Sequence, residues 1–201
     1  LNGKNGIYFD GGTNDLTSSV DMPAIGANDF TVMVLASVYA DASTNRNFIS
    51  CNTETGATGA GVWQLAQRDV NDIRWIFKNS GTNKSLVNDV FVAGQAHVIS
   101  AEMQRIDNDN LKKLAHVDGT EVMDTANYLS EDSGSVTNTA KLSIGSRAEG
   151  AIVANKMNYF ESVVLHSRDD ATRQKIEGYW AHKWGLTASL PSGHPYKTAP
   201  A

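Results

Sequence analysis

Two aspartates, Asp107 and Asp109, are the acidic pair in this sequence that a β-strand could present on a single face. Such a pair matters because glycoside hydrolysis uses two carboxyl groups that flank one glycosidic bond. The pair lies in an Asp-Asn-Asp-Asn run, however, and these residue types favour a solvated turn. Glu102 and Glu161 fall in strand-like segments, and neither has an acidic residue two positions away. We therefore expect no catalytic residues and a protein that is not an enzyme.

Calcium is the metal that this sequence could hold, with Asp107 and Asp109 as the candidate ligands. The run that contains them lacks the glycine and the distal glutamate of an EF-hand loop. Asp10, Asn14 and Asp15 form a second cluster, although Asp and Asn in turns usually bond to their own backbone. The five histidines are scattered, without the spacing of zinc ligands. Apart from calcium, we expect no cofactor.

Tryptophan rings stack on the apolar faces of sugars, so Trp63, Trp75 and the neighbouring Arg74 are the candidate glycan-binding residues. Trp75 alternates with Ile73 and Phe77, a pattern that favours core packing and places Arg74 on the opposite face of the strand. Trp63 follows a glycine-rich loop, and both a cleft edge and the core fit its position. The sequence leaves these alternatives open.

Short strand-like runs between Gly, Asn, Asp and Ser clusters must position these residues, and their spacing favours a β-sandwich. The run over 29–40 is apolar and β-branched on both faces, as in a central strand. Asp118 and Gly119 are typical of a two-residue hairpin turn. Further strands are predicted over 73–78, 97–103, 111–117 and 156–166.

The C-terminal part of the chain predicts an amphipathic helix over about 169–184, capped by Asp169 or Asp170. Gly185 stands where a left-handed helix stop is expected. Pro191 and Pro195 predict an extended tail over 186–201. One face of this helix is expected to be buried, with the apolar side chains Ile176, Tyr179, Trp180 and Trp184.

Four segments carry a family resemblance: RQKIEGYWAHKWGL (173–186), LPSGHPY (190–196), YFDGGTNDL (8–16) and LSIGSR (142–147). They resemble the laminin G-like, concanavalin A-like lectin and glucanase domains of phage virion proteins and of proteins secreted by aquatic bacteria. The resemblance implies an all-β fold: a two-sheet antiparallel jelly-roll sandwich with one C-terminal α-helix packed on it, as a single domain over 1–201. Gly12 is an extra residue in the opening turn, and Arg168 replaces an apolar residue before the helix.

Composition excludes several function classes. A net charge of -5 disfavours nucleic acid, whose binding needs clustered Lys and Arg. The sequence has no apolar stretch near the roughly 20 residues of a membrane span, so we expect no membrane insertion. Cys51 has no second cysteine to pair with. Because the first residue is Leu1, we expect a processed product or a domain of a longer protein.

The resemblance implies a non-catalytic, surface-exposed module with glycan-binding or adhesion activity. It would be a phage virion component, as a capsid decoration or fibre protein, or a cell-surface component, located on the virion surface or extracellularly. The expected partners are a glycan or host-surface polysaccharide, other virion or surface proteins, and further copies of the chain. The alternatives are a purely structural virion protein without a ligand and a secreted polysaccharide hydrolase.

Overall fold

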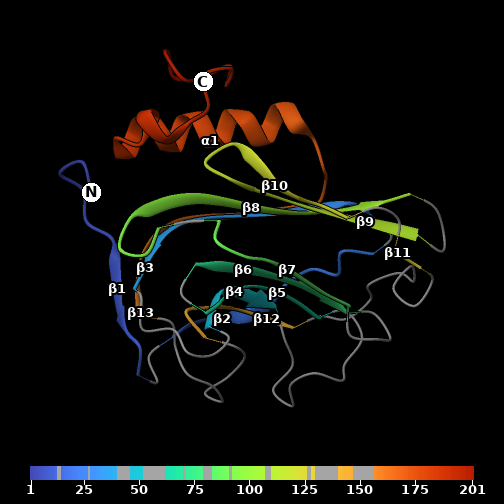
Figure 1. The fold of residues 1–201 in the computed structure, drawn as a ribbon. Helices are drawn as coiled ribbons and strands as arrows, with labels where there is room; N and C mark the ends of the chain where they lie inside the picture. The colour runs from blue at the N-terminus through green and yellow to red at the C-terminus, as the bar shows by residue number, and fades with distance from the viewer. Residues whose placement is uncertain are drawn as a thin grey trace.

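Two antiparallel β-sheets and one C-terminal helix make up the computed structural model (Figure 1). The structure describes residues 1–12, 15–26, 28–39, 46–51, 62–69, 71–78, 83–90, 92–106, 110–125, 128–129, 140–146 and 156–201. The strands are β1 (Ile7–Asp10), β2 (Leu16–Asp21), β3 (Phe30–Val38), β4 (Arg46–Cys51), β5 (Val62–Arg68), β6 (Asp72–Lys78), β7 (Asn83–Val87), β8 (Ala96–Arg105), β9 (Asn110–Val117), β10 (Thr120–Asp124), β11 (Tyr128–Leu129), β12 (Lys141–Ile144) and β13 (Lys156–Leu165).

The seven-stranded sheet has the order β1-β13-β3-β8-β9-β10, with β11 paired to β9, and the six-stranded sheet has the order β2-β12-β4-β5-β6-β7. Figure 1 shows the seven-stranded sheet between the other sheet and helix α1 (Asp170–Trp184). The predicted all-β sandwich with one packed helix is therefore confirmed. Its central strand is also confirmed, because β3 lies between β13 and β8.

Alternation along β3 explains why both of its faces are apolar. Val32 and Val34 point into the core between the sheets, whereas Met33 and Leu35 join the cluster beneath α1. A strand buried on both faces is a near-continuous apolar run, and this is the pattern over 29–40. The predicted hairpin is confirmed too: Asp118 and Gly119 have φ of 52° and 79° and join β9 to β10.

Helix α1 begins and ends at the predicted signals. The Asp169 side chain accepts a hydrogen bond from the Thr172 backbone N–H at 2.9 Å, and Gly185 is left-handed with φ of 75°. The Leu186 N–H then donates to the Ala181 carbonyl at 2.7 Å, which closes the helix end. Trp180 and Trp184 are buried as predicted, but the prediction was wrong for Tyr179, which is half exposed.

The segment after the helix does not form the extended tail that its prolines suggested. A 3₁₀ helix, η1 (Thr187–Ser189), is followed by turns that bring His194 and Tyr196 back onto α1. The chain can approach here because position 178 is a glycine: a Cβ on Gly178 would lie 2.3 Å from the Tyr196 Cβ. Helix and tail therefore form one packed unit on the seven-stranded sheet.

Candidate functional site

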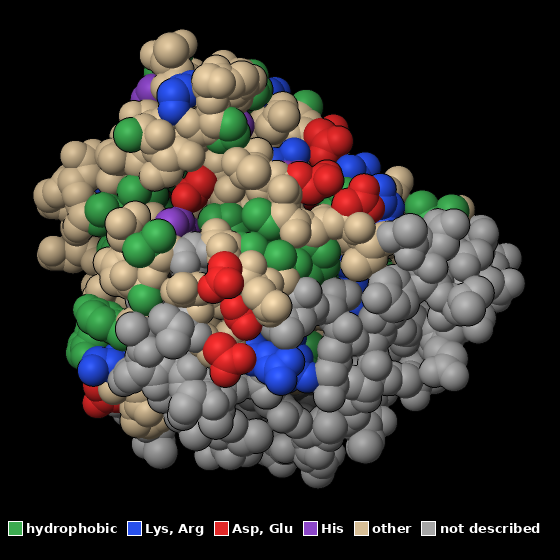
Figure 2. Space-filling model, in the orientation of Figure 1, with side chains coloured by type: hydrophobic (Ala, Val, Ile, Leu, Met, Phe, Trp, Pro, Cys, Tyr) green, Lys and Arg blue, Asp and Glu red, His purple; other side chains and the backbone are tan. Residues whose placement is uncertain are grey.

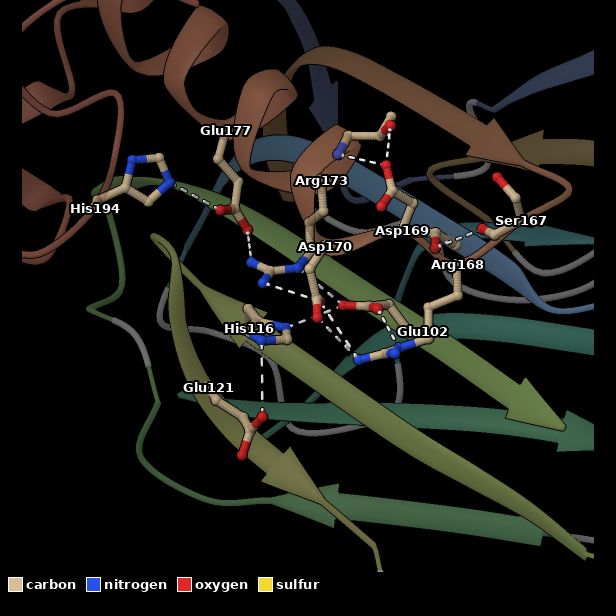
Figure 3. Close-up of polar contacts among 12 residues, drawn as sticks. Glu102, His116, Glu121, Ser167, Arg168, Asp169, Asp170, Arg173, Glu177 and His194 are labelled. Atoms are coloured by element: carbon tan, nitrogen blue, oxygen red, sulfur yellow. Dashed lines mark hydrogen bonds and ion pairs between the residues drawn. The ribbon is translucent and has the colours of Figure 1, made fainter. Parts of the chain in front are cut away.

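Ionisable side chains gather where α1 meets the seven-stranded sheet. We call six of them the buried ion network: Glu102, His116, Arg168, Arg173, Glu177 and His194 (Figure 3). Glu102 and His116 come from the sheet, and the others come from α1 and its flanking segments. In Figure 2, acidic and basic side chains lie next to each other at the end of the molecule where α1 begins.

Glu102 is the centre of this network and is fully buried. Its Oε2 lies 3.1 Å from Arg168 Nε and its Oε1 lies 3.1 Å from Arg173 Nε. These contacts are ion pairs without hydrogen-bonding geometry, and the 3.2 Å contact between Glu102 Oε1 and His116 Nδ1 also lacks that geometry. Arg168 thus supplies one of the two cations that neutralise a buried carboxylate.

Glu177 connects the helix to the tail. Its Oε1 accepts a hydrogen bond from Arg173 Nη1 at 2.7 Å, and its Oε2 accepts one from His194 Nε2 at 3.1 Å. The Tyr196 N–H donates to His194 Nδ1 at 3.2 Å, so Nε2 is the ring nitrogen that donates to Glu177. Burial alone would lower the pKa of the Arg173 guanidinium, but Glu177, Glu102 and Asp170 outweigh it and raise that pKa.

The buried ion network is a packing device and does not form a reaction site. Glu102, His116, Arg173, Glu177 and His194 are all buried, so a substrate cannot reach the carboxylates. Buried charges need partners, and here each carboxylate has an arginine. The arrangement fixes how α1 sits on the sheet, because any shift of the helix would separate these charges.

The outer face of the six-stranded sheet carries mostly neutral polar side chains, unlike the buried ion network. One row of side chains crosses it in register: Thr17 on β2, Ser143 on β12, Ser50 on β4 and Gln64 on β5. The next row places Asn47 and Arg74 on either side of Ala66. Inward-facing core residues alternate with these positions, which fixes the direction of the polar side chains. We call Thr17, Ser143, Ser50, Gln64, Asn47 and Arg74 the polar face.

Hydroxyl groups at one side of the polar face form a chain of hydrogen bonds. Thr17 Oγ1 lies 3.2 Å from Ser143 Oγ and donates to Asp15 Oδ2 at 2.9 Å. Ser146 Oγ donates to the same carboxylate oxygen at 2.7 Å, and Ser50 Oγ donates to the Ser146 carbonyl at 3.1 Å. Thr17 is exposed and Arg74 is half-buried, so these two residues are the solvent-accessible parts of the polar face.

The structure separates the predicted glycan-binding residues. Trp63 and Trp75 are 1% and 0% exposed and contact Phe30 between the sheets, with ring centroids 6.0 and 5.6 Å away. The stacking role considered for these two rings is therefore wrong, because the strand alternation directs them into the core, which is the alternative that the sequence left open. Arg74 lies on the opposite face from Trp75, as predicted, and belongs to the polar face.

The predicted calcium ligands Asp107 and Asp109 lie outside the described residues. In the opening turn, Asp10 Oδ1 accepts the Gly12 N–H at 2.8 Å, which is the backbone bonding expected of such a turn. No group of three His, Cys, Asp or Glu side chains that could hold a metal occurs in the described part of the chain. Its helix is also not long and apolar enough to cross a membrane.

Comparison with solved structures identifies the fold as a jelly-roll, lectin-like domain. The CBM40 domain of the Ruminococcus gnavus IT-sialidase, bound to α2,3-sialyllactose, has a TM-score of 0.59 at 10% identity over 84% of this chain and 94% of that one. A heptameric SAP-like pentraxin from Limulus polyphemus has a TM-score of 0.60 at 10% identity, over 86% and 79%. The NanB sialidase from Streptococcus pneumoniae gives 0.60 at 14%, over 84% of this chain and 27% of that one.

These identities are low, so the likeness is one of fold. No family model matches the sequence, and the comparison with curated proteins finds no match.

Sequence reasoning missed Ser50, Gln64 and Ser143. The signal was present in three short strings, Ile-Ser-Cys (49–51), Trp-Gln-Leu (63–65) and Leu-Ser-Ile (142–144), in which one polar residue stands between two apolar ones. Each string predicts a strand with one apolar and one polar face. What the strings do not contain is the register that aligns their polar residues across the sheet.

Proposed function

We propose that this chain is a non-catalytic glycan-binding module whose ligand lies against the polar face. The observation that carries this proposal is the pair of accessible residues on the polar face, Thr17 and Arg74, which lie at opposite sides of a buried row of hydroxyl and amide side chains. Sugars present many hydroxyl groups, to which the Thr17 hydroxyl and the Arg74 guanidinium can bond. The other sheet is less suited to this role, because α1 and the tail cover its outer face.

The lectin-like fold supports the same function. CBM40 domains of this fold were solved with α2,3- and α2,6-sialyllactose, which are acidic sugars. A guanidinium group binds a carboxylate through paired, charge-assisted hydrogen bonds. Arg74 is the arginine of the polar face, so we propose that the ligand carries a carboxylate or a sulfate group.

We further propose that the module is displayed on a surface, as a capsid decoration or fibre protein of a phage virion or as a cell-surface component. The support for this placement is the resemblance of the end segments to laminin G-like virion domains. Its partners would be a host-surface polysaccharide and the proteins that anchor it. A purely structural virion protein without a ligand is the alternative, and the binding experiment below separates the two.

Binding is tested with the whole chain on an array of neutral, sialylated and sulfated glycans, followed by calorimetry with the strongest ligand. Arg74→Ala is expected to reduce affinity by about 10- to 100-fold, because a charge-assisted pair contributes roughly 1.5 to 3 kcal/mol. Thr17→Val tests the exposed end of the polar face and keeps the side-chain shape. Lys175→Ala, on the exposed side of α1, is the matched loss of a positive charge and should bind normally.

If no glycan on the array binds, the alternative of a purely structural virion protein without a ligand is favoured. If Arg74→Ala and Lys175→Ala reduce the glycan affinity equally, binding depends on net charge. That result would contradict a site on the polar face. Release of reducing ends from laminarin, agarose or carrageenan would instead support the hydrolase alternative.

A further inference from the structure

The first strands of the two sheets leave apolar side chains exposed along one side of the sandwich. β1 is the edge strand of the seven-stranded sheet and β2 is the edge strand of the six-stranded sheet. Ile7 and Tyr8 on β1 are 47% and 54% exposed, and Leu16 and Val20 on β2 are 44% and 71% exposed. We call these four side chains the edge strip.

The two edge strands lie on the same side of the molecule. Phe9 of β1 packs against Gly145, where a Cβ would lie 2.8 Å from the Phe9 ring. Gly145 directly follows β12, which is the strand paired with β2. The Leu16 end of β2, which pairs with Ile144, therefore lies close to β1, whereas Val20 lies toward the other end of β2.

Edge strands of soluble proteins are usually protected by charged residues, prolines or bulges. From Asn5 to Phe9 this chain has none of these, because the five residues are Asn, Gly, Ile, Tyr and Phe. Charges stand only on either side, at Lys4 and Asp10, and both residues are exposed. An edge that is apolar in the middle and oppositely charged at its two ends is suited to antiparallel pairing with an identical edge.

We infer that residues 4–10, which comprise β1 and the three residues before it, pair antiparallel with the same residues of a second copy of this chain, around a two-fold axis that passes through Ile7. Residues 4–6 precede β1 and would extend it in the dimer. In this register Lys4 lies opposite Asp10 of the second copy, so two ion pairs form by symmetry. Gly6 lies opposite Tyr8 of the second copy. The two Ile7 side chains face each other at the axis.

The register is specific, because moving the axis by one residue, to Tyr8, would place Gly6 opposite Asp10 and leave Lys4 without an opposite charge. Pairing would join the two seven-stranded sheets into one continuous sheet across the dimer. Leu16 then lies near the junction and adds apolar area to an otherwise short strand contact. The polar face is on the outer side of the other sheet, so both copies keep it available.

Sedimentation velocity of the whole chain over a range of concentrations tests this inference. We expect a monomer–dimer equilibrium, and Ile7→Lys should abolish it, because each copy would then place a charge against the same charge of its partner. The matched control is Ile106→Lys, since Ile106 is 48% exposed and lies outside the edge strip. That variant should dimerise like the parent chain.

A charge exchange tests the register itself. Lys4→Asp alone and Asp10→Lys alone should each weaken the dimer, whereas the double variant should restore it, because the opposed charges are attractive again. Ile7→Cys should form a covalent dimer on mild oxidation, because the two thiols meet at the axis and Cys51 is buried.

A chain that stays monomeric at every concentration, or a dimer that Ile7→Lys leaves intact, would overturn the inference. So would failure of the double variant to recover, or association with a different protein's strand in place of self-association. Glycan binding is a separate readout, because Ile7→Lys leaves every residue of the polar face unchanged.

Discussion

The two sheets of this sandwich bury polar side chains in opposite ways. On the helix-covered face, full charges are enclosed: Glu102 and Glu177 are each paired with Arg173. On the polar face, the enclosed groups are neutral hydroxyls and amides such as Ser50, Ser143 and Gln64. A buried charge tolerates almost no displacement of its partner, whereas a hydroxyl can exchange one neutral hydrogen bond for another. The first face is therefore suited to holding a helix, whereas on the second face only Thr17 and Arg74 are accessible to a ligand.

The largest expected effect comes from removing the central charge of the buried ion network. Glu102→Gln should lower the free energy of unfolding by about 3 to 5 kcal/mol, because it leaves two arginines facing a neutral group. Urea denaturation followed by tryptophan fluorescence measures this change. Glu121→Gln is the matched control, since the Glu121 side chain is 51% exposed and lies 3.9 Å from His116. Equal stability of the two variants would mean that the network does not hold the helix.

A substitution on the polar face is expected to lower the free energy of unfolding by less. Ser50→Ala removes the hydrogen bond to the Ser146 carbonyl and should cost about 1 kcal/mol, the usual contribution of a neutral hydrogen bond. The same urea denaturation gives the value, and Ser189→Ala on the exposed 3₁₀ helix serves as the control. A loss as large as that of Glu102→Gln would erase the proposed difference between the two faces.

The smallest expected change in stability comes from the Asp169 cap at the start of α1, and it depends on pH. Hydrogen bonds from the Thr172 hydroxyl and backbone lower the pKa of the Asp169 carboxyl below its usual value of 3.8. A lowered pKa in the folded state means that the stabilisation is present above the unfolded value and is lost as the pH falls through the folded value. The stability advantage of the parent chain over Asp169→Asn should therefore be larger at about pH 7 than at about pH 2.5. Thermal unfolding of both proteins measures it, and a difference that stays constant with pH would contradict this role.

The sequence alone predicts a structural element correctly where the pattern that encodes it is local. The apolar run of β3, the Asp118–Gly119 turn and the Asp169 cap each depend on neighbours within a few positions, and all three are confirmed. Tyr179 shows the limit of a helical pattern. Ile176, Trp180 and Trp184 repeat every four residues and lie on one side of α1, whereas Tyr179 is rotated by roughly 100° from Trp180.

Features that join distant segments could not be predicted from the residues alone. The contacts of Glu102 with Arg168 and Arg173 depend on how α1 lies on the sheet, and no spacing in the sequence encodes that placement. The tail illustrates the same limit, because a proline fixes only its own φ. The Lys197 ammonium group donates to the carbonyls of Thr187, Ala188 and Leu190 and so closes the tail into a compact loop.

Gly178 has a consequence for how the C-terminal part of the chain holds together. A glycine in the middle of a helix weakens it by roughly 1 kcal/mol relative to alanine, so α1 is intrinsically a poor helix at the point where Tyr196 rests on it. The packed Tyr196 side chain stabilises the helix at this position. Removal of the residues from Tyr196 onward would therefore expose the helix surface around Gly178 to solvent. It would also weaken the packing of the aromatic residues that hold α1 on the sheet.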